Sequence, residues 1–128
     1  MQSKYFLLFV ISVAILGLMA TLWLPHWSGS LYLLIVIGYL FRATWLHILS
    51  AGGVIALVWV IVALSWDLPN DRILSQRVAE LFGVSPPILW LITAMIGFLL
   101  GLVGTGLGRA LRDILPQKPP RWHERRKA

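Results

Sequence analysis

Four long apolar stretches, separated by short polar breaks, dominate the hydrophobic pattern of the chain. Residues 5–24 form the first, an uninterrupted run without a charged side chain. A helix of that length rises about 30 Å, which matches the hydrocarbon thickness of a bilayer. The other three stretches cover residues 27–46, 48–66 and 87–107. The pattern therefore predicts an all-α integral membrane protein, a bundle of four transmembrane helices.

The second and third stretches are nearly continuous, which raises the alternative of a single long helix. A helix over residues 27–66 would be about 60 Å long, twice the thickness of the hydrocarbon core. A hairpin at residues 42–47 avoids this mismatch. It also places Arg42, the only charged residue in that stretch, at a membrane surface.

A secretory signal peptide is the alternative interpretation of residues 1–24. The positively charged n-region that such a peptide needs would consist here only of Lys4 and the amino terminus. The apolar run is also longer than the usual 7 to 15 residues, and no small-x-small cleavage pattern follows it. We expect this segment to be retained as a transmembrane span.

A shorter amphipathic helix is expected over residues 71–82, between the third and fourth spans. Asn70 is a plausible N-cap and Gly83 a plausible C-terminal stop. Four apolar side chains fall on one side of this helix: Leu74, Val78, Leu81 and Phe82. The helix is expected to lie on the membrane surface or to cap the bundle, and the alternative is docking of a partner.

Charge divides the chain into a transmembrane domain, residues 1–108, and a basic tail, residues 109–128. Nine of the eleven Lys and Arg residues fall on one side of a four-span bundle, so both termini are expected in the cytoplasm. The overall layout resembles that of small bacterial inner-membrane proteins, which implies that membrane as the location.

Seven basic residues of the tail are expected to contact anionic lipid headgroups: Arg109, Arg112, Lys118, Arg121, Arg125, Arg126 and Lys127.

The fourth span carries a stripe of small residues at helical spacing: Gly97, Gly101, Gly104 and Gly108. Glycines on one helix face let another backbone approach closely, which is how helices associate in lipid. Packing inside the chain is one interpretation, against Gly52, Ala56 and Ala63 of the third span or Ala14, Gly17 and Thr21 of the first. An interface with a second copy or with another membrane protein is the other.

The sequence contains few residues that are suited to catalysis or to transport of ions. Spans that move ions or protons usually carry a buried ionisable group, and residues 5–24, 48–66 and 87–107 contain none. The four-span small multidrug exporters carry a glutamate in their first span, which this chain lacks. The chain has no cysteine, and its three histidines lie too far apart for a metal site. No catalytic residue, metal ligand or cofactor is therefore assigned.

We expect a small non-enzymatic membrane protein that serves as an accessory or structural subunit of a complex or homo-oligomer. Its partners would be the bilayer and another membrane protein or itself, and no nucleic acid is expected. The alternative is a small pore or carrier, since holins resemble this chain in size, span number and basic tail. A third hypothesis is a lipid-modifying enzyme, in which His26 would meet the three acidic residues Asp67, Asp71 and Glu80.

Overall fold

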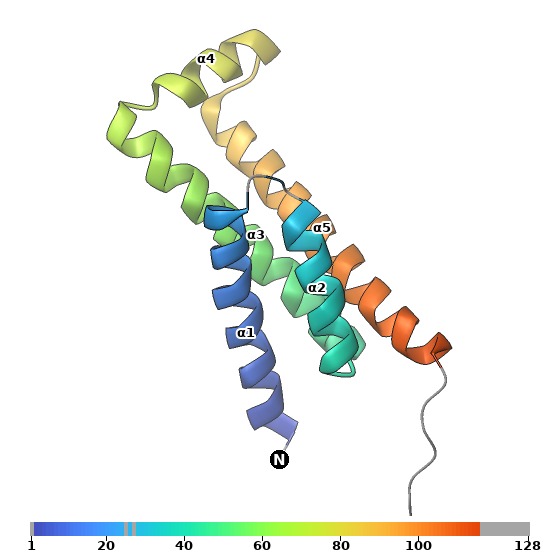
Figure 1. The fold of residues 1–128 in the computed structure, drawn as a ribbon. Coiled ribbons are helices and arrows are strands. Elements are labelled where there is room, and N and C mark those ends of the chain that lie inside the picture. The colour runs from blue at the N-terminus through green and yellow to red at the C-terminus, as the bar shows by residue number, and fades with distance from the viewer. Residues whose placement is uncertain (1, 25, 27, 116–128) are drawn as a thin grey trace, which may run out of the picture.

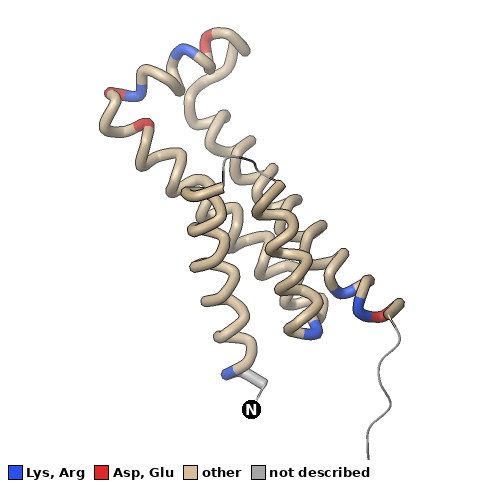
Figure 2. The backbone as a smooth tube through the Cα atoms, in the orientation of Figure 1, with Lys and Arg blue, Asp and Glu red and all other residues tan. Residues whose placement is uncertain are grey.

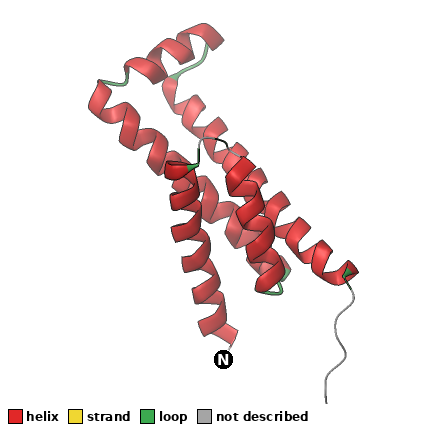
Figure 3. Cartoon of the chain, viewed as in Figure 1, coloured by secondary structure: helices red, strands yellow, loops and turns green. Residues whose placement is uncertain are grey.

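The fold is seen in a computed structural model that describes residues 2–24, 26 and 28–115. All regular structure in this part of the chain is helical (Figures 1 and 3). In order along the chain, the elements are α1 (Gln2–Trp23), α2 (Ser28–Leu40), α3 (Trp45–Asp67), the 3-10 helix η1 (Leu68–Asn70), α4 (Ile73–Phe82) and α5 (Pro86–Ile114). The expected all-α class is confirmed for these residues.

Among the described residues, three helical segments are long and apolar enough to cross a membrane: Lys4–Trp23, Trp45–Asn70 and Pro86–Ile114. The fourth apolar helix, α2, has only 13 residues and rises about 20 Å, less than the thickness of a hydrocarbon core. The expectation that it would extend to residue 46 is wrong. Arg42 takes a left-handed conformation in the turn after α2, and α3 already begins at Trp45.

The helices pack around a central pair formed by α3 and α5 (Figure 1). Helix α2 lies mainly against α5, while α1 lies against α3 and α2. Helices α3 and α5 extend beyond the end of α1 and the start of α2, and α4 lies at their far end (Figure 1).

A small apolar core lies where α1, α2 and α3 meet. Its fully or almost fully buried members are Phe9, Val13, Leu34, Ile37, Ala51 and Ile55. Most large apolar side chains instead point outward, including Leu57 on α3 and Leu91 on α5, each more than 60% exposed. In water such a surface would be costly, whereas in a bilayer these side chains contact lipid.

Charged side chains gather at the two ends of the molecule and leave an uncharged belt between them (Figure 2). We call one the cationic end; its described charged residues are Lys4, Arg42, Arg109, Arg112 and Asp113. We call the other the α4 end; its charged residues are Asp67, Asp71, Arg72, Arg77 and Glu80. This is the separation that a membrane-crossing bundle requires, because charged groups are costly in hydrocarbon.

The sequence signals for helix ends were partly wrong. Gly83 ends α4 in the left-handed conformation (φ 64°), as expected for a C-terminal glycine. Asn70, however, does not cap α4, because its side-chain amide donates to the Trp66 carbonyl, and Arg72 precedes the helix instead. Helix α5 continues to Ile114 rather than ending near residue 107, so the first two basic residues of the expected tail are helical.

Candidate functional site

The glycine stripe of α5 packs closely against two neighbouring helices, and its first half forms a seam with α3. Gly97 and Gly101 face α3. A Cβ atom at position 101 would lie 2.6 Å from the Gly52 Cα and 2.7 Å from the Ala51 carbonyl oxygen. At position 97 it would lie 3.1 Å from the Ala56 Cα. The two backbones are therefore in direct contact, which maximises dispersion attraction between them.

The other half of the stripe faces α2. A Cβ atom at Gly104 would lie 2.7 Å from the Leu34 Cβ, and one at Gly108 would lie 2.8 Å from the Tyr39 nitrogen. The glycine of α2, Gly38, sits with equal closeness against the α5 backbone at Thr105. One face of α5 thus packs against α3 along its first half and against α2 along its second half.

All four glycines of the stripe are buried. Packing within the chain, one of the two interpretations of the stripe, is therefore the arrangement in the structure. A second copy could reach these glycines only by displacing α2 or α3. Of the expected partners, Gly52 and Ala56 of α3 do meet the stripe, whereas Gly17 of α1 faces the Ile55 side chain.

Two basic residues of the expected tail lie on the last turns of α5 and contact other helices. Arg112 Nη1 donates to the Tyr39 carbonyl oxygen at 2.6 Å, which satisfies a carbonyl left open at the end of α2. Arg109 lies 3.9 Å from the Asp113 carboxylate and stacks over the Trp45 ring. Five more expected lipid contacts lie outside the described residues: Lys118, Arg121, Arg125, Arg126 and Lys127.

An aromatic cluster at the cationic end surrounds His47. The imidazole ring meets the rings of Phe6 and Phe9 edge-on, with centroids 5.3 and 4.7 Å apart. Its Nδ1 atom lies 2.6 Å from the Thr44 hydroxyl and 3.4 Å from the Thr44 backbone nitrogen. Since a backbone N–H can only donate, Nδ1 is the acceptor there, which leaves the proton of the neutral ring on Nε2. His47 therefore ties the start of α3 to α1.

A cavity of about 870 Å³ opens beside this cluster. Its walls come from the start of α1, the turn after α2 and the start of α3. Seven residues line it: Tyr5, Phe6, Phe41, Arg42, Thr44, Leu46 and His47. No sequence pattern indicates this cavity, because its residues come together only when the α2–α3 turn folds against α1.

The residues of the hypothetical lipid-modifying site are not gathered in one place. His26 is exposed and borders a small pocket whose α3 wall is formed by Trp59, Val62 and Ala63. Asp67 is buried further along α3, where its Oδ1 atom accepts the Ser75 backbone N–H at 3.2 Å. No ion pair joins His26 to a carboxylate in the described part of the chain.

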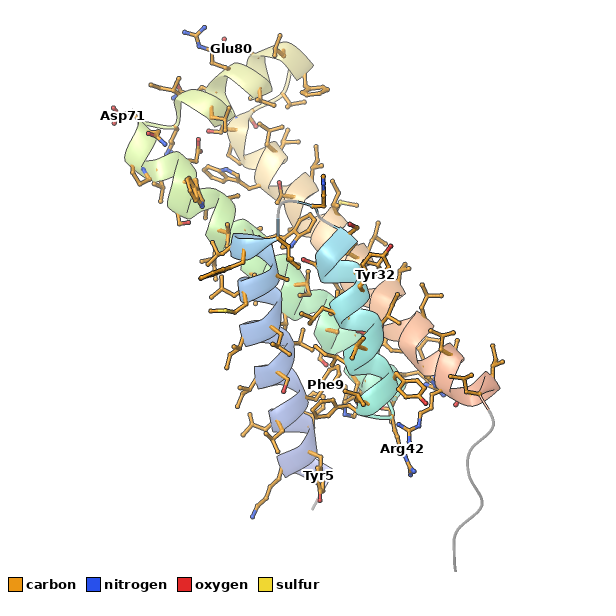
Figure 4. All side chains as sticks on the ribbon, viewed as in Figure 1. Tyr5, Phe9, Tyr32, Arg42, Asp71 and Glu80 are labelled. Carbon is orange, nitrogen blue, oxygen red and sulfur yellow. The ribbon has the colours of Figure 1, made fainter. Side chains whose placement is uncertain are left out.

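The acidic residues of α4 and the preceding turn lie farther out still. Asp71 and Glu80 both sit at the α4 end (Figure 4). Among residues 2–24, 26 and 28–115, no group of three His, Asp or Glu side chains could hold a metal ion.

Helix α4 turns its large apolar side chains away from the rest of the molecule. The residues that it buries are the small Ser75 and Ala79. Leu74, Leu81 and Phe82 are 68%, 84% and 74% exposed. The expected apolar side of this helix exists, but its largest members do not cap the bundle.

Comparison with known proteins adds no relative: no family model, no curated protein and no solved structure matches the chain.

Proposed function

We propose that this protein is a non-enzymatic accessory or structural subunit of a membrane complex, and that it binds its partner through α4. The observation that carries the proposal is the exposed apolar side of α4. Apolar side chains at a protein end rimmed by charged groups are typical of interaction sites. Here Leu74, Leu81 and Phe82 share that end with Arg77 and Glu80.

The packing of the central helices supports a role in holding α4 in place for a partner rather than a role in catalysis. Backbone contact between α3 and α5, at Gly101 and Gly52, makes this pair a stiff support. Helix α4 joins the two helices at their far end, so its position is set by both. A rigid pair of helices that keeps an apolar helix exposed is consistent with a structural subunit that binds another membrane protein.

The orientation in the membrane follows from the charges. We propose that the cationic end faces the cytoplasm of a bacterial cell and that α4 lies on the outer side of the inner membrane. The positive-inside rule supports this orientation, since the described charges of the cationic end are four cations and Asp113. Both termini would then be cytoplasmic, because α1 begins and α5 ends at that end (Figure 1).

Gentle solubilisation from native membranes, with identification of the proteins that co-purify, tests the proposal. The variant Leu74→Ser/Leu81→Ser should lose the partner and keep the fold, because both side chains are exposed. Gln76→Ser on the polar side of α4 is the matched control and should retain the partner. Equal recovery of one partner with both variants would contradict docking through α4.

A leakage assay separates this function from the pore hypothesis. Reconstituted protein should release no trapped dye from vesicles if it acts as a subunit. Dye release by the purified chain alone would favour the pore and overturn the proposal.

A further inference from the structure

We propose that the cavity at the cationic end binds one anionic phospholipid, with the Arg42 guanidinium paired to the phosphate. This ligand site is independent of the proposed docking through α4, which lies at the opposite end of the molecule. Figure 4 shows Tyr5, Phe9 and Arg42 together at this end.

The lining of the cavity has the two-part chemistry of an amphiphile site. Phe6, Phe41 and Leu46 supply apolar surface, while Arg42 and Thr44 supply polar groups. The residues that line the cavity belong to the cationic end, which borders the uncharged belt of the backbone seen in Figure 2. At that depth a bilayer places its glycerol and phosphate groups, so a phospholipid can meet both kinds of surface at once.

Arg42 supplies the specificity for a negative charge. No ion pair with a carboxylate occupies its guanidinium among the residues that the structure describes. A guanidinium can donate two parallel hydrogen bonds to a phosphate, and such charge-assisted pairs are stronger than neutral ones. A net positive end favours the same choice of anion over zwitterion.

The backbone at Arg42 is unusual in a way that fits a binding role. Its φ of 51° lies in the left-handed region, where a glycine would be unstrained. Strained backbone of this kind concentrates at ligand-binding positions. Here the turn keeps a cation in the lining of the cavity although glycine would suit its conformation better.

The start of α3 adds a further positive potential. Thr44, Leu46 and His47 line the cavity, so the first turn of this 23-residue helix borders it. The amino-terminal end of a helix carries a partial positive charge that favours anions. Helix dipole and guanidinium therefore act on the same bound group.

Native mass spectrometry of the full-length protein tests the site. The protein is released from micelles that contain phosphatidylglycerol and phosphatidylcholine in equal amounts. We expect one phosphatidylglycerol to be retained per chain in preference to phosphatidylcholine. Arg42→Gln should lower that preference about fivefold, the effect of one basic group beside an anionic surface. Equal retention of the two lipids by the unmodified protein would overturn the proposal.

Arg42→Gly separates lipid binding from folding. It removes the cation and relieves the left-handed strain, so the fold should stay intact by circular dichroism while the lipid preference falls as in Arg42→Gln. An Arg42→Gly protein that keeps the preference would contradict the role of the guanidinium.

A pair of uncharged substitutions separates the cavity from diffuse surface charge. Leu46→Trp narrows the cavity, whereas Leu49→Trp adds the same bulk to another exposed position of α3, outside the cavity. Only Leu46→Trp should reduce retention of phosphatidylglycerol. Equal behaviour of the two variants would show that the lipid binds elsewhere.

If inorganic phosphate alone binds with the same Arg42 dependence, the occupant is a free anion and the lipid assignment is wrong.

Discussion

The α3–α5 seam and the α1–α3 contact both hold two helices together in lipid, but different groups make the two contacts. At the seam, Gly101 lies directly against the backbone of Ala51 and Gly52. At α1, the contact is made by bulky groups, with the buried Phe9 ring set edge-on to Phe41 and His47. Lipid removes the hydrophobic drive for helix association, so each contact depends on fit alone. Backbone atoms therefore make the contact at the seam, whereas side-chain rings make the contact at α1.

The largest expected effect comes from placing a side chain in the seam. Gly101→Leu puts a branched group where even a Cβ atom would lie 2.6 Å from the Gly52 Cα. Because backbone cannot move aside as a side chain can, we expect a loss of about 3 kcal/mol or more in the free energy of unfolding. Chemical denaturation in mixed micelles, followed by circular dichroism, measures it. A loss below about 1 kcal/mol would mean that the seam is not closed in solution.

Truncation at the α1 contact should cost less. Phe9→Ala removes a fully buried ring, and we expect a loss of about 2 kcal/mol by the same measurement. The lower figure reflects that an apolar side chain gains little by leaving lipid. A loss larger than that of Gly101→Leu would reverse the ranking of the two contacts. Exposed Leu16→Ala on the same helix is the control, with little change expected.

A smaller effect is expected where α5 meets the end of α2. Arg112→Gln removes the charge-assisted hydrogen bond to the Tyr39 carbonyl, and the loss should be about 1 to 2 kcal/mol. Hydrogen exchange of the last turn of α2 locates it, since fraying should raise exchange there more than in α3. Uniform exchange across both helices would argue against a capping role.

The smallest effect has the opposite sign. Gly106 lies on the same helix as the seam, yet a Cβ atom there would meet nothing within 4 Å. Gly106→Ala should therefore leave the fold intact and raise the free energy of unfolding by up to about 1 kcal/mol, because alanine favours helix. Destabilisation by Gly106→Ala would show that a surface absent from the single chain covers this glycine.

The sequence predicted the features that depend on local pattern. The all-helical class, the turn near Arg42 and the amphipathic helix before Gly83 follow from spacing and composition. The glycine stripe also follows from spacing, but its packing against Gly52 was only one of two interpretations that the sequence left open. These features are set within one or two helical turns, or by a repeat along a single helix face.

Features that depend on tertiary contact escaped prediction. The length of α2 could not be foreseen, because the apolar pattern resumes at residues 45 and 46 after Arg42, and the left-handed turn at Arg42 lies where the helix stops. The cavity beside His47 depends on α1 folding back onto the start of α3. The same holds for Gly38, whose role appears only once α2 is laid against Thr105.

The shortness of α2 has a consequence for the lipid around the protein. Its exposed flank offers about 20 Å of apolar helix, while the flank formed by α3 offers the full depth of a bilayer core. If α2 borders lipid, acyl chains beside it would have to compress or tilt, at a cost of a fraction of a kcal/mol for each ångström of mismatch. We therefore expect the protein to be favoured where the membrane is thin.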